Sequence, residues 1–584
     1  MQFPLRRYWR LLARYLTPQR HRMGLLAALL LGGIALELVA PQILRAFLDR
    51  AQVGALPRAL YGAAALFLGV AALAQVAAVT EAYVAETIGW TATNRLRADL
   101  AEHCLRLDLA FHHARTPGEL IERIDGDVTT LANFFSRFTV AVVGNALLLL
   151  GVLALLWREE WRIGLGVGLF ALVTLAAMLR LYATARPRWA AVSQEGALFY
   201  GFVGERLTGA EDLRTSGPPA VWHALGRLEE RLRHWRGLLL RAVFMGQAVW
   251  MAALGLLALA NALTLLIASA RFLAGSATIG TIYLIFSYTA LLIRPIGRLQ
   301  AEIQDLQRAG ASIDRVEELF RARPAIGDGP GEPLPDGALA VEFAGVTFAY
   351  GGGPPALRAV TFALAPGATL GLLGRTGSGK TTLARLLPRF YDPASGVIRL
   401  GGLDVREARL TDVRARVGLV PQEVQLFAAS VRDNLTFFDP AIPDARLLAA
   451  IDALGLRPWF DALPAGLGTM LAPGGGGLST GEAQLLAFVR VFLKDAGLVI
   501  LDEASSRLDP ATEGLIAGAI DRLLAGRTAI IIAHRLATVR RADAIMILED
   551  GRIVEHGARE VLLRDGASRF ARLLRAGDDM EVLS

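Results

Sequence analysis

The sequence has 584 residues, which is too long for one domain and indicates roughly three or four structural units. Hydrophobic residues make up 54% and charged residues only 20%, a balance that excludes an ordinary soluble protein and indicates a membrane protein. The net charge is +7, but the arginines flank apolar stretches, so we expect membrane topology and no nucleic-acid partner. The single cysteine, Cys104, excludes an intrachain disulfide.

The first element expected is an amphipathic helix within residues 1–20. Apolar and aromatic side chains fall on one helical face of residues 3–18, and arginines fall on the other. This pattern predicts an elbow helix that lies in the membrane interface with lipid as its partner. The alternative is an amphipathic helix packed on protein.

Six apolar stretches follow, and they predict a transmembrane domain over residues 21–320 with six helices and two long cytoplasmic loops. Most of them approach or exceed the ~20 residues that a helix needs to cross hydrocarbon. The six stretches are residues 25–44, 60–84, 140–157, 163–183, 243–270 and 279–293.

Arginines indicate the orientation of these helices. They are frequent before the first stretch and in segments 95–137 and 186–241, and rare in the three short loops on the other side. We therefore expect the termini and both long loops to be cytoplasmic, in a multi-pass protein of the bacterial cytoplasmic (inner) membrane.

Polar residues within the apolar stretches are costly and should face protein or a water-filled cavity. They are Glu37, Asn145, Arg180, Gln247 and Asn261. Glu37 and Arg180 could line a substrate path, pair within the bundle or reach an interface, and the sequence leaves these alternatives open.

A segment rich in proline and glycine, residues 321–337, predicts a linker. From 338 to 584, short β-type runs alternate with helical ones, which predicts an α/β domain with a parallel sheet.

The run GRTGSGKT matches the phosphate-binding loop pattern in full, between an apolar strand and a helical run. Backbone N–H groups of such a loop surround the phosphates of ATP, the lysine neutralises them, and the next hydroxyl binds Mg²⁺. Lys380 and Lys494 are the only two lysines of the sequence, so a lysine in this loop indicates a chemical need. The expected ATP-binding residues here are Gly374, Arg375, Thr376, Gly377, Ser378, Gly379, Lys380, Thr381 and Thr382, with Thr381 also on the metal.

The run LVILDE predicts a buried strand with two carboxylates at its end. We expect Asp502 to hold the metal ion and Glu503 to orient or deprotonate the attacking water. His534 follows a second apolar strand, where it could bond the γ-phosphate. The alternatives are a structural acidic pair and a structural histidine.

Together these motifs resemble a half-transporter of the ABC exporter class, with six spans of the type IV exporter fold fused to one ATPase domain. The resemblance implies that Tyr350 stacks on adenine and that Gln422 contacts Mg²⁺ and signals to the membrane part. It implies that residues 506–509 cross to a second ATPase domain. It also implies that segments 111–128 and 200–215 contact the ATPases.

In this family the signature motif of one ATPase domain contacts the ATP held by the other, and LSTGEAQ occupies that position here. The resemblance assigns Ser479 and Gly481 to the partner's nucleotide. Thr480 replaces a glycine, Glu482 a glutamine and Ala483 an arginine. Ser479 and Glu482 also fit a capping box, which specifies the helix without reference to a ligand.

The altered signature predicts an asymmetric heterodimer, in which a different subunit completes the hydrolytic site of this chain. Glu482 would bring negative charge towards the partner's ATP. The alternatives are a homodimeric exporter, an importer built on the same fold, and a non-transporting ATP-gated regulator. The substrate stays open among amphipathic small molecules, lipids and peptides.

Overall fold

The computed structural model describes residues 13–133, 139–292, 309–502, 510–533 and 539–581. The chain divides into two units, each with its own internal contacts. The helical unit comprises Met1–Leu105 and Pro117–Ala322, and the α/β unit comprises Arg106–Thr116 and Arg323–Ser584. Glu503, His534 and residues 506–509 lie outside the described residues.

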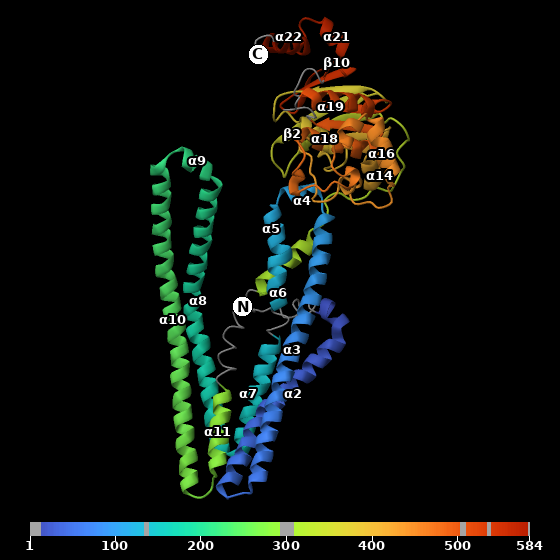
Figure 1. Ribbon diagram of the computed structural model, residues 1–584. Coiled ribbons are helices and arrows are strands. Elements are labelled where there is room, and N and C mark those ends of the chain that lie inside the picture. The colour runs from blue at the N-terminus through green and yellow to red at the C-terminus, as the bar shows by residue number, and fades with distance from the viewer. Residues whose placement is uncertain (1–12, 134–138, 293–308, 503–509, 534–538, 582–584) are drawn as a thin grey trace. The chain divides into compact units, whose positions relative to one another are not determined.

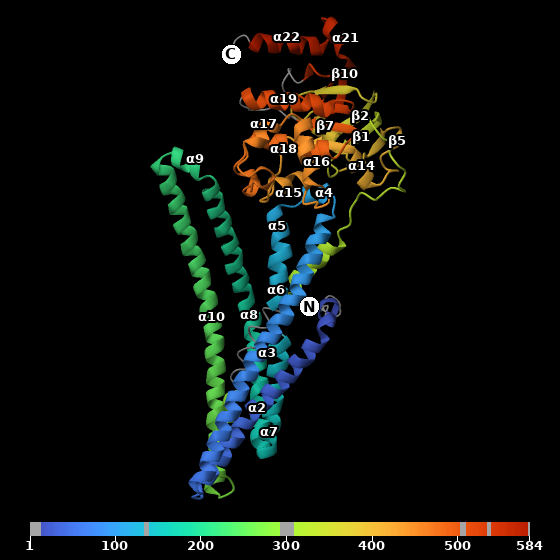
Figure 2. The same ribbon diagram turned by 45° about the vertical axis from the view of Figure 1, so that its right-hand side comes forward.

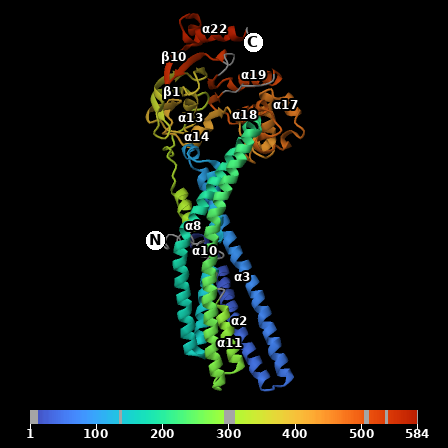
Figure 3. The same cartoon turned by 90° about the vertical axis from the view of Figure 1, so that its left-hand side faces the viewer.

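The helical unit consists of long helices joined by short turns (Figure 1). Its named elements are η1 (Thr17–Gln19), α2 (Arg20–Gln52), α3 (Pro57–Leu105), α5 (Pro117–Ile121), the π-helical η2 (Glu122–Asp127), α6 (Val128–Asn133), α7 (Thr139–Glu159), α8 (Trp161–Thr208), α9 (Ala210–Thr215), α10 (Pro218–Leu273) and α11 (Ile279–Leu291). Helices α8 and α10 run side by side, as Figures 1 and 3 show from two directions, and α9 joins them (Figure 1).

In the part of the chain that the structure describes, an apolar helix overlaps each of the six predicted stretches. Among the described residues, three helices are long and apolar enough to cross a membrane, Ala13–Gln52, Pro57–Leu105 and Val142–Glu159. Shorter apolar helices cover Trp161–Thr174, Ala258–Leu273 and Ile279–Leu291. The arginine-rich segments, expected as loops, are largely continuations of these helices: α8 has 48 residues and α10 has 56. The helical conformation of α8 continues through Pro187, although proline removes one backbone hydrogen bond there.

Within the described ranges, a buried apolar cluster lies where α7, α8 and α11 meet. Tyr288 is fully buried there, and its hydroxyl group donates a hydrogen bond of 2.8 Å to the carbonyl oxygen of Leu38. Gln42 Nε2 donates to the same hydroxyl at 2.9 Å. These bonds satisfy polar groups that would be costly in hydrocarbon, and they join α2 to α11.

The described strands of the α/β unit form two sheets. Its strands are β1 (Val341–Ala349), β2 (Pro355–Leu364), β3 (Thr369–Leu373), β4 (Ser395–Leu400), β5 (Leu403–Asp404), β6 (Val417–Val420), β7 (Leu498–Asp502), β8 (Thr528–Ile532), β9 (Ala544–Glu549) and β10 (Arg552–Ala558). The larger sheet has the order β10-β9-β3-β8-β7-β6, and all of its pairs except β9–β10 are parallel. The smaller sheet, β2-β1-β4-β5, is antiparallel.

Strands β3, β7 and β8 are buried at every residue, as expected for a parallel sheet covered by helices. The helices of this unit are α4 (Leu109–His113), α13 (Lys380–Leu386), α14 (Leu410–Arg416), α15 (Val431–Thr436), α16 (Asp444–Ala453), α17 (Arg457–Asp461), η4 (Gly466–Gly468), η5 (Pro473–Gly475), α18 (Thr480–Leu493), α19 (Pro510–Leu524), α21 (Arg559–Arg564) and α22 (Arg569–Glu581). Figure 2 shows α16, α18 and α19 beside the strands. The predicted fold class, a helical membrane domain followed by an α/β phosphate-loop domain, is confirmed.

Candidate functional site

Three neighbouring parallel strands of the larger sheet end at the same level. In the register of the sheet, Ile532 at the end of β8 pairs with Leu372 of β3 on one side and with Asp502 of β7 on the other. The phosphate-binding loop begins directly after β3, at Gly374. The sheet therefore brings the loop and the Asp502 carboxylate, far apart in sequence, to one edge, where ligands of such folds bind.

The loop from Gly374 to Lys380 depends on glycine. Gly374, Gly377 and Gly379 have φ values of +148°, +84° and +103°, a region that other residues rarely adopt. Gly379 is the N-cap of α13 and offers no side chain to bond the first N–H groups of that helix. These N–H groups are therefore available to an anion.

Lys380 holds its ammonium group inside this loop. The side chain is 5% exposed, and Nζ donates hydrogen bonds to the carbonyl oxygens of Gly374 at 2.6 Å and Arg375 at 3.0 Å. The hydroxyl group of Ser378 is buried and bonds no described residue. The buried ammonium group of Lys380 and the hydroxyl group of Ser378 are therefore suited to binding the phosphates of a nucleotide.

Replacing Gly379 with alanine is expected to lower the thermal unfolding midpoint of the purified protein. A β-carbon there would lie 2.7 Å from both the carbonyl oxygen of Ala356 and Cδ2 of Leu357, and the backbone conformation would cost about 1–3 kcal/mol. Gly514→Ala in α19 is the matched control: no atom lies within 4 Å of its added β-carbon, so stability should stay equal or rise. Equal midpoints for the two variants would contradict this reading.

The three residues predicted to hold Mg²⁺ differ in their exposure to solvent. Asp502 is 8% exposed at the end of β7, whereas Thr381 and Gln422 are exposed. Gln422 follows β6 by two residues, and β6 pairs with β7. A carboxylate, a hydroxyl group and an amide around a phosphate site suit Mg²⁺, which takes oxygen ligands and few of them from protein.

Tyr350 follows β1 and is 38% exposed. Its ring makes edge contacts with Phe348 and Tyr391, at centroid distances of 4.8 and 5.2 Å. Its hydroxyl group donates to Oγ1 of Thr382 at 3.2 Å, which ties the ring to α13. A partly exposed aromatic face joined to the phosphate-loop helix is suited to stacking on the base of a bound nucleotide.

The altered signature forms a complete capping box at the start of α18. Ser479 Oγ accepts a hydrogen bond from the Glu482 N–H at 3.2 Å, and Glu482 Oε2 accepts one from the Ser479 N–H at 2.7 Å. The carboxylate of Glu482 is therefore turned back onto its own helix. This geometry weakens the expectation that its charge opposes a partner's ATP. Gly481 is buried beside it.

Arg490 is a residue that sequence reasoning missed. It lies on α18 and donates to the carbonyl oxygens of Asn434 at 2.7 Å and Gln425 at 3.1 Å, and its guanidinium group lies 4.5 Å from the ring centroid of Phe437. Burial lowers the pKa of Arg490 to about 10. These bonds join the signature helix to the segment after Gln422. The sequence feature that could have predicted this role is the single arginine within the apolar run LLAFVRVFL.

Of segment 111–128, which we expect to contact the ATPases, the part up to Thr116 belongs to the α/β unit and the part from Pro117 onward belongs to the helical unit. Asp108 caps α4 by accepting a bond of 3.1 Å from the Phe111 N–H, and Leu109 packs against the apolar core of this unit. The second segment expected to contact the ATPases, near α9, belongs to the helical unit, and its contact stays a prediction. The roles of Glu37 and Arg180 also stay predictions.

Comparisons with known proteins agree with both halves of the chain. Residues 23–296 match the ABC transporter transmembrane region, and residues 357–506 match the ABC transporter family. An ATP-dependent lipid A-core flippase of Thiobacillus denitrificans is 33% identical over 577 residues, covering 97% of each chain. The uncharacterized ABC transporter ATP-binding protein YknV of Bacillus subtilis is 30% identical, covering 97% of this chain and 94% of the relative.

A solved structure of a bacterial Atm1-family ABC exporter with ATP bound has a similar fold. The TM-score is 0.79 at 24% sequence identity, covering 95% of this chain and 98% of that one. The chain therefore belongs to the ABC transporter family, as an exporter half-transporter in which a multi-pass membrane region is fused to one ATP-hydrolysing region.

Proposed function

We propose that two copies of this chain form a transporter that uses ATP to move lipid-like amphipathic molecules across the membrane. The observation that carries the proposal is the 33% identity, over 97% of both chains, to a protein named for flipping lipid A-core. The buried ammonium group of Lys380 inside an intact glycine loop supports ATP binding by each copy. The capping box of Glu482 supports the pairing of like subunits, since its charge is turned inward.

Each copy supplies one set of catalytic groups. The loop around Lys380 would hold the phosphates, Asp502 with Thr381 and Gln422 would hold Mg²⁺, and Glu503 would orient the attacking water. The metal ion would neutralise charge on the phosphates. His534 would bond the γ-phosphate. ATP must bind the closed pair of ATPase regions more tightly than the open pair. ATP binding then shifts the membrane helices towards the conformation that releases the transported molecule.

The first test is purification of this chain by itself in lipid nanodiscs. We expect a particle of two copies with ATPase activity, which rises when lipopolysaccharide-type lipid is added. A soluble peptide of the same concentration is the control and should leave the rate unchanged. A monomer without turnover would overturn the homodimer, and equal stimulation by lipid and peptide would overturn the substrate class.

A second candidate, the asymmetric heterodimer, is favoured by one observation: Thr480 adds a side chain where the family has glycine. The double variant Thr480→Gly/Glu482→Gln restores the usual signature and keeps the capping box, since glutamine also fits its third position. If two copies of this chain form the transporter, we expect the double variant to change the ATPase rate by less than about threefold. The reason is that Glu482 does not repel the ATP of the other copy, so its replacement relieves no repulsion. A rise of about tenfold or more would favour the unlike partner instead.

A further inference from the structure

Charged side chains join the membrane helices at the end of the helical unit that carries its short turns. The turns at residues 53–56, 160 and 274–278 lie at this one end, as Figures 1 and 3 show. The distribution of arginines predicts that this end faces the outside of the membrane. The charges beside the turns pair across different helices, so they connect helix ends that are far apart in the sequence.

Arg45 of α2 is at the centre of these contacts. Its Nη1 donates a hydrogen bond of 2.8 Å to Oε1 of Glu159, the last residue of α7. Its Nε lies 3.8 Å from Oδ2 of Asp49, one turn further along α2. Asp49 in turn accepts a hydrogen bond of 3.0 Å from the Gly280 N–H, at the start of α11. One arginine and one aspartate therefore join the ends of α2, α7 and α11.

The approach of α11 to α2 at this point requires glycine. A β-carbon on Gly280 would lie 2.6 Å from the carbonyl oxygen of Arg45 and closer still to the Asp49 carboxylate. The hydrogen bonds of Tyr288, described above, continue the contact between the same two helices towards the middle of the membrane. The outer half of α11 is therefore held against α2 by a row of polar contacts.

A second ion pair joins the other outer ends. Arg271, in the last turn of α10, pairs with Glu160, which directly follows α7. The Ser276 hydroxyl group donates a bond of 3.0 Å to the carbonyl oxygen of Arg271 and so fixes the turn between α10 and α11. We call the five charged residues of these contacts the outer clasp: Arg45, Asp49, Glu159, Glu160 and Arg271.

The outer clasp is accessible to water. The side chains of Arg45 and Glu159 are 29% and 21% exposed, and that of Arg271 is 43% exposed. Ion pairs that water reaches stabilise a structure only modestly, because water replaces the lost partner when the pair separates. Contacts of this strength suit helix ends that close and open in each transport cycle.

We propose that the outer clasp holds the ends of α2, α7, α10 and α11 together and thereby disfavours the conformation that releases the transported molecule. The inference rests on the proposed function, in which ATP binding favours that conformation. A contact that stabilises the closed outer ends then lowers the apparent affinity for ATP, since a smaller fraction of the molecules is in the conformation that binds ATP tightly.

Hydrogen exchange at Gly280 in the unsubstituted protein is the first test. The Gly280 N–H lies in the first turn of α11, where a helix offers no partner, so its protection depends on Asp49. A non-hydrolysable ATP analogue, added to the full-length protein in nanodiscs, should speed exchange there about fivefold, the scale for losing one hydrogen bond. A clasp with a purely structural role would give the same exchange with and without the analogue.

The second test replaces Glu159 with glutamine, which keeps the size of the side chain and removes its charge. The concentration of a fluorescent ATP analogue that half-saturates the protein should fall about threefold to fivefold. Arg45→Gln should lower it similarly, and both substitutions together should do little more than either alone. High salt should reduce the difference between Glu159→Gln and the unsubstituted protein, because salt screens the ion pair.

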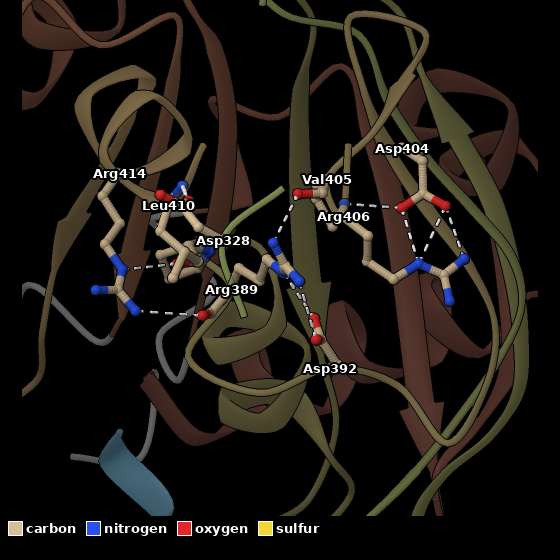
Figure 4. A network of polar contacts seen from close by, with 9 residues as sticks. Asp328, Arg389, Asp392, Asp404, Val405, Arg406, Leu410 and Arg414 are labelled. Carbon is tan, nitrogen blue, oxygen red and sulfur yellow. Dashed lines mark hydrogen bonds and ion pairs between the residues drawn. The ribbon is translucent and has the colours of Figure 1, made fainter. Parts of the chain in front are cut away.

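Arg406→Gln is the matched control, because Arg406 also pairs with a carboxylate at a partly exposed position, but within the α/β unit (Figure 4). Its Nη2 lies 2.7 Å from Oδ2 of Asp404 on β5. This variant should bind the analogue within about twofold of the unsubstituted protein, since it leaves the outer clasp intact.

The direction of the change separates the outer clasp from a general loss of structure, which would weaken binding of the analogue. Unchanged or weaker binding in Glu159→Gln, an equal fall in Arg406→Gln, or exchange at Gly280 that ignores the analogue would each overturn the role of the outer clasp. If the unsubstituted protein did not bind the analogue, the proposed function would be wrong instead.

Discussion

Replacing Lys380 with alanine is expected to reduce ATP hydrolysis by about 100-fold or more, the scale for losing one charge-stabilising group in a preorganised site. The ammonium group is 5% exposed and lies among the carbonyl oxygens of Gly374 and Arg375, where the phosphates of ATP would meet it. Alanine leaves those phosphates without their buried cation. ATP turnover and binding of a fluorescent ATP analogue, measured on the purified chain in nanodiscs, check this expectation.

Lys494→Ala is the matched control, because Lys494 is the only other lysine. Its Nζ donates to the Val417 carbonyl oxygen at 3.0 Å at the end of α18, away from the phosphate loop. We expect this variant to lose some stability and to keep most of its turnover. If Lys380→Ala hydrolysed ATP at more than half the unsubstituted rate, the assignment of the phosphate loop would be wrong.

Replacing Glu503 with glutamine is expected to lower turnover by about 10²–10⁴-fold while leaving ATP binding intact, because the amide cannot accept the proton of the attacking water. Strand β7 ends at Asp502, so Glu503 directly follows a residue at the sheet edge that carries the site. Nucleotide that is bound but not hydrolysed should keep the two ATPase regions together. Retained radiolabelled ATP after gel filtration, and arrested lipid transport in vesicles, measure these effects.

The control for Glu503→Gln is Glu560→Gln, the same chemical change at an exposed position in the first turn of α21. This variant should retain the unsubstituted rate of hydrolysis and should not retain ATP. A Glu503→Gln protein that hydrolyses ATP like the Glu560→Gln protein would disprove the role proposed for Glu503.

The signature segment illustrates how far sequence reasoning reaches. The spacing of Ser479 and Glu482 predicted a capping box, and the structure confirms it with two hydrogen bonds. The same residues also predicted repulsion of a partner's ATP and hence an unlike subunit. The comparisons show an ABC transporter and give no support to the unlike subunit. The spacing of two residues shows that they can form a local hydrogen bond. It does not show whether the Glu482 carboxylate accepts that bond from Ser479 or faces the ATP of a partner subunit.

The sequence by itself determined the class of this protein. Apolar runs of membrane-spanning length predict the helical half, and the pattern from Gly374 to Lys380 predicts the phosphate site, because both depend only on residues close together in the chain. Tertiary structure alone decided that Asp502 and Leu372 flank the same Ile532, that Arg490 joins α18 to the segment after Gln422, and that Tyr391 packs against Tyr350. Such contacts join residues tens to hundreds of positions apart, and strand register and core packing, which no local pattern encodes, bring them together.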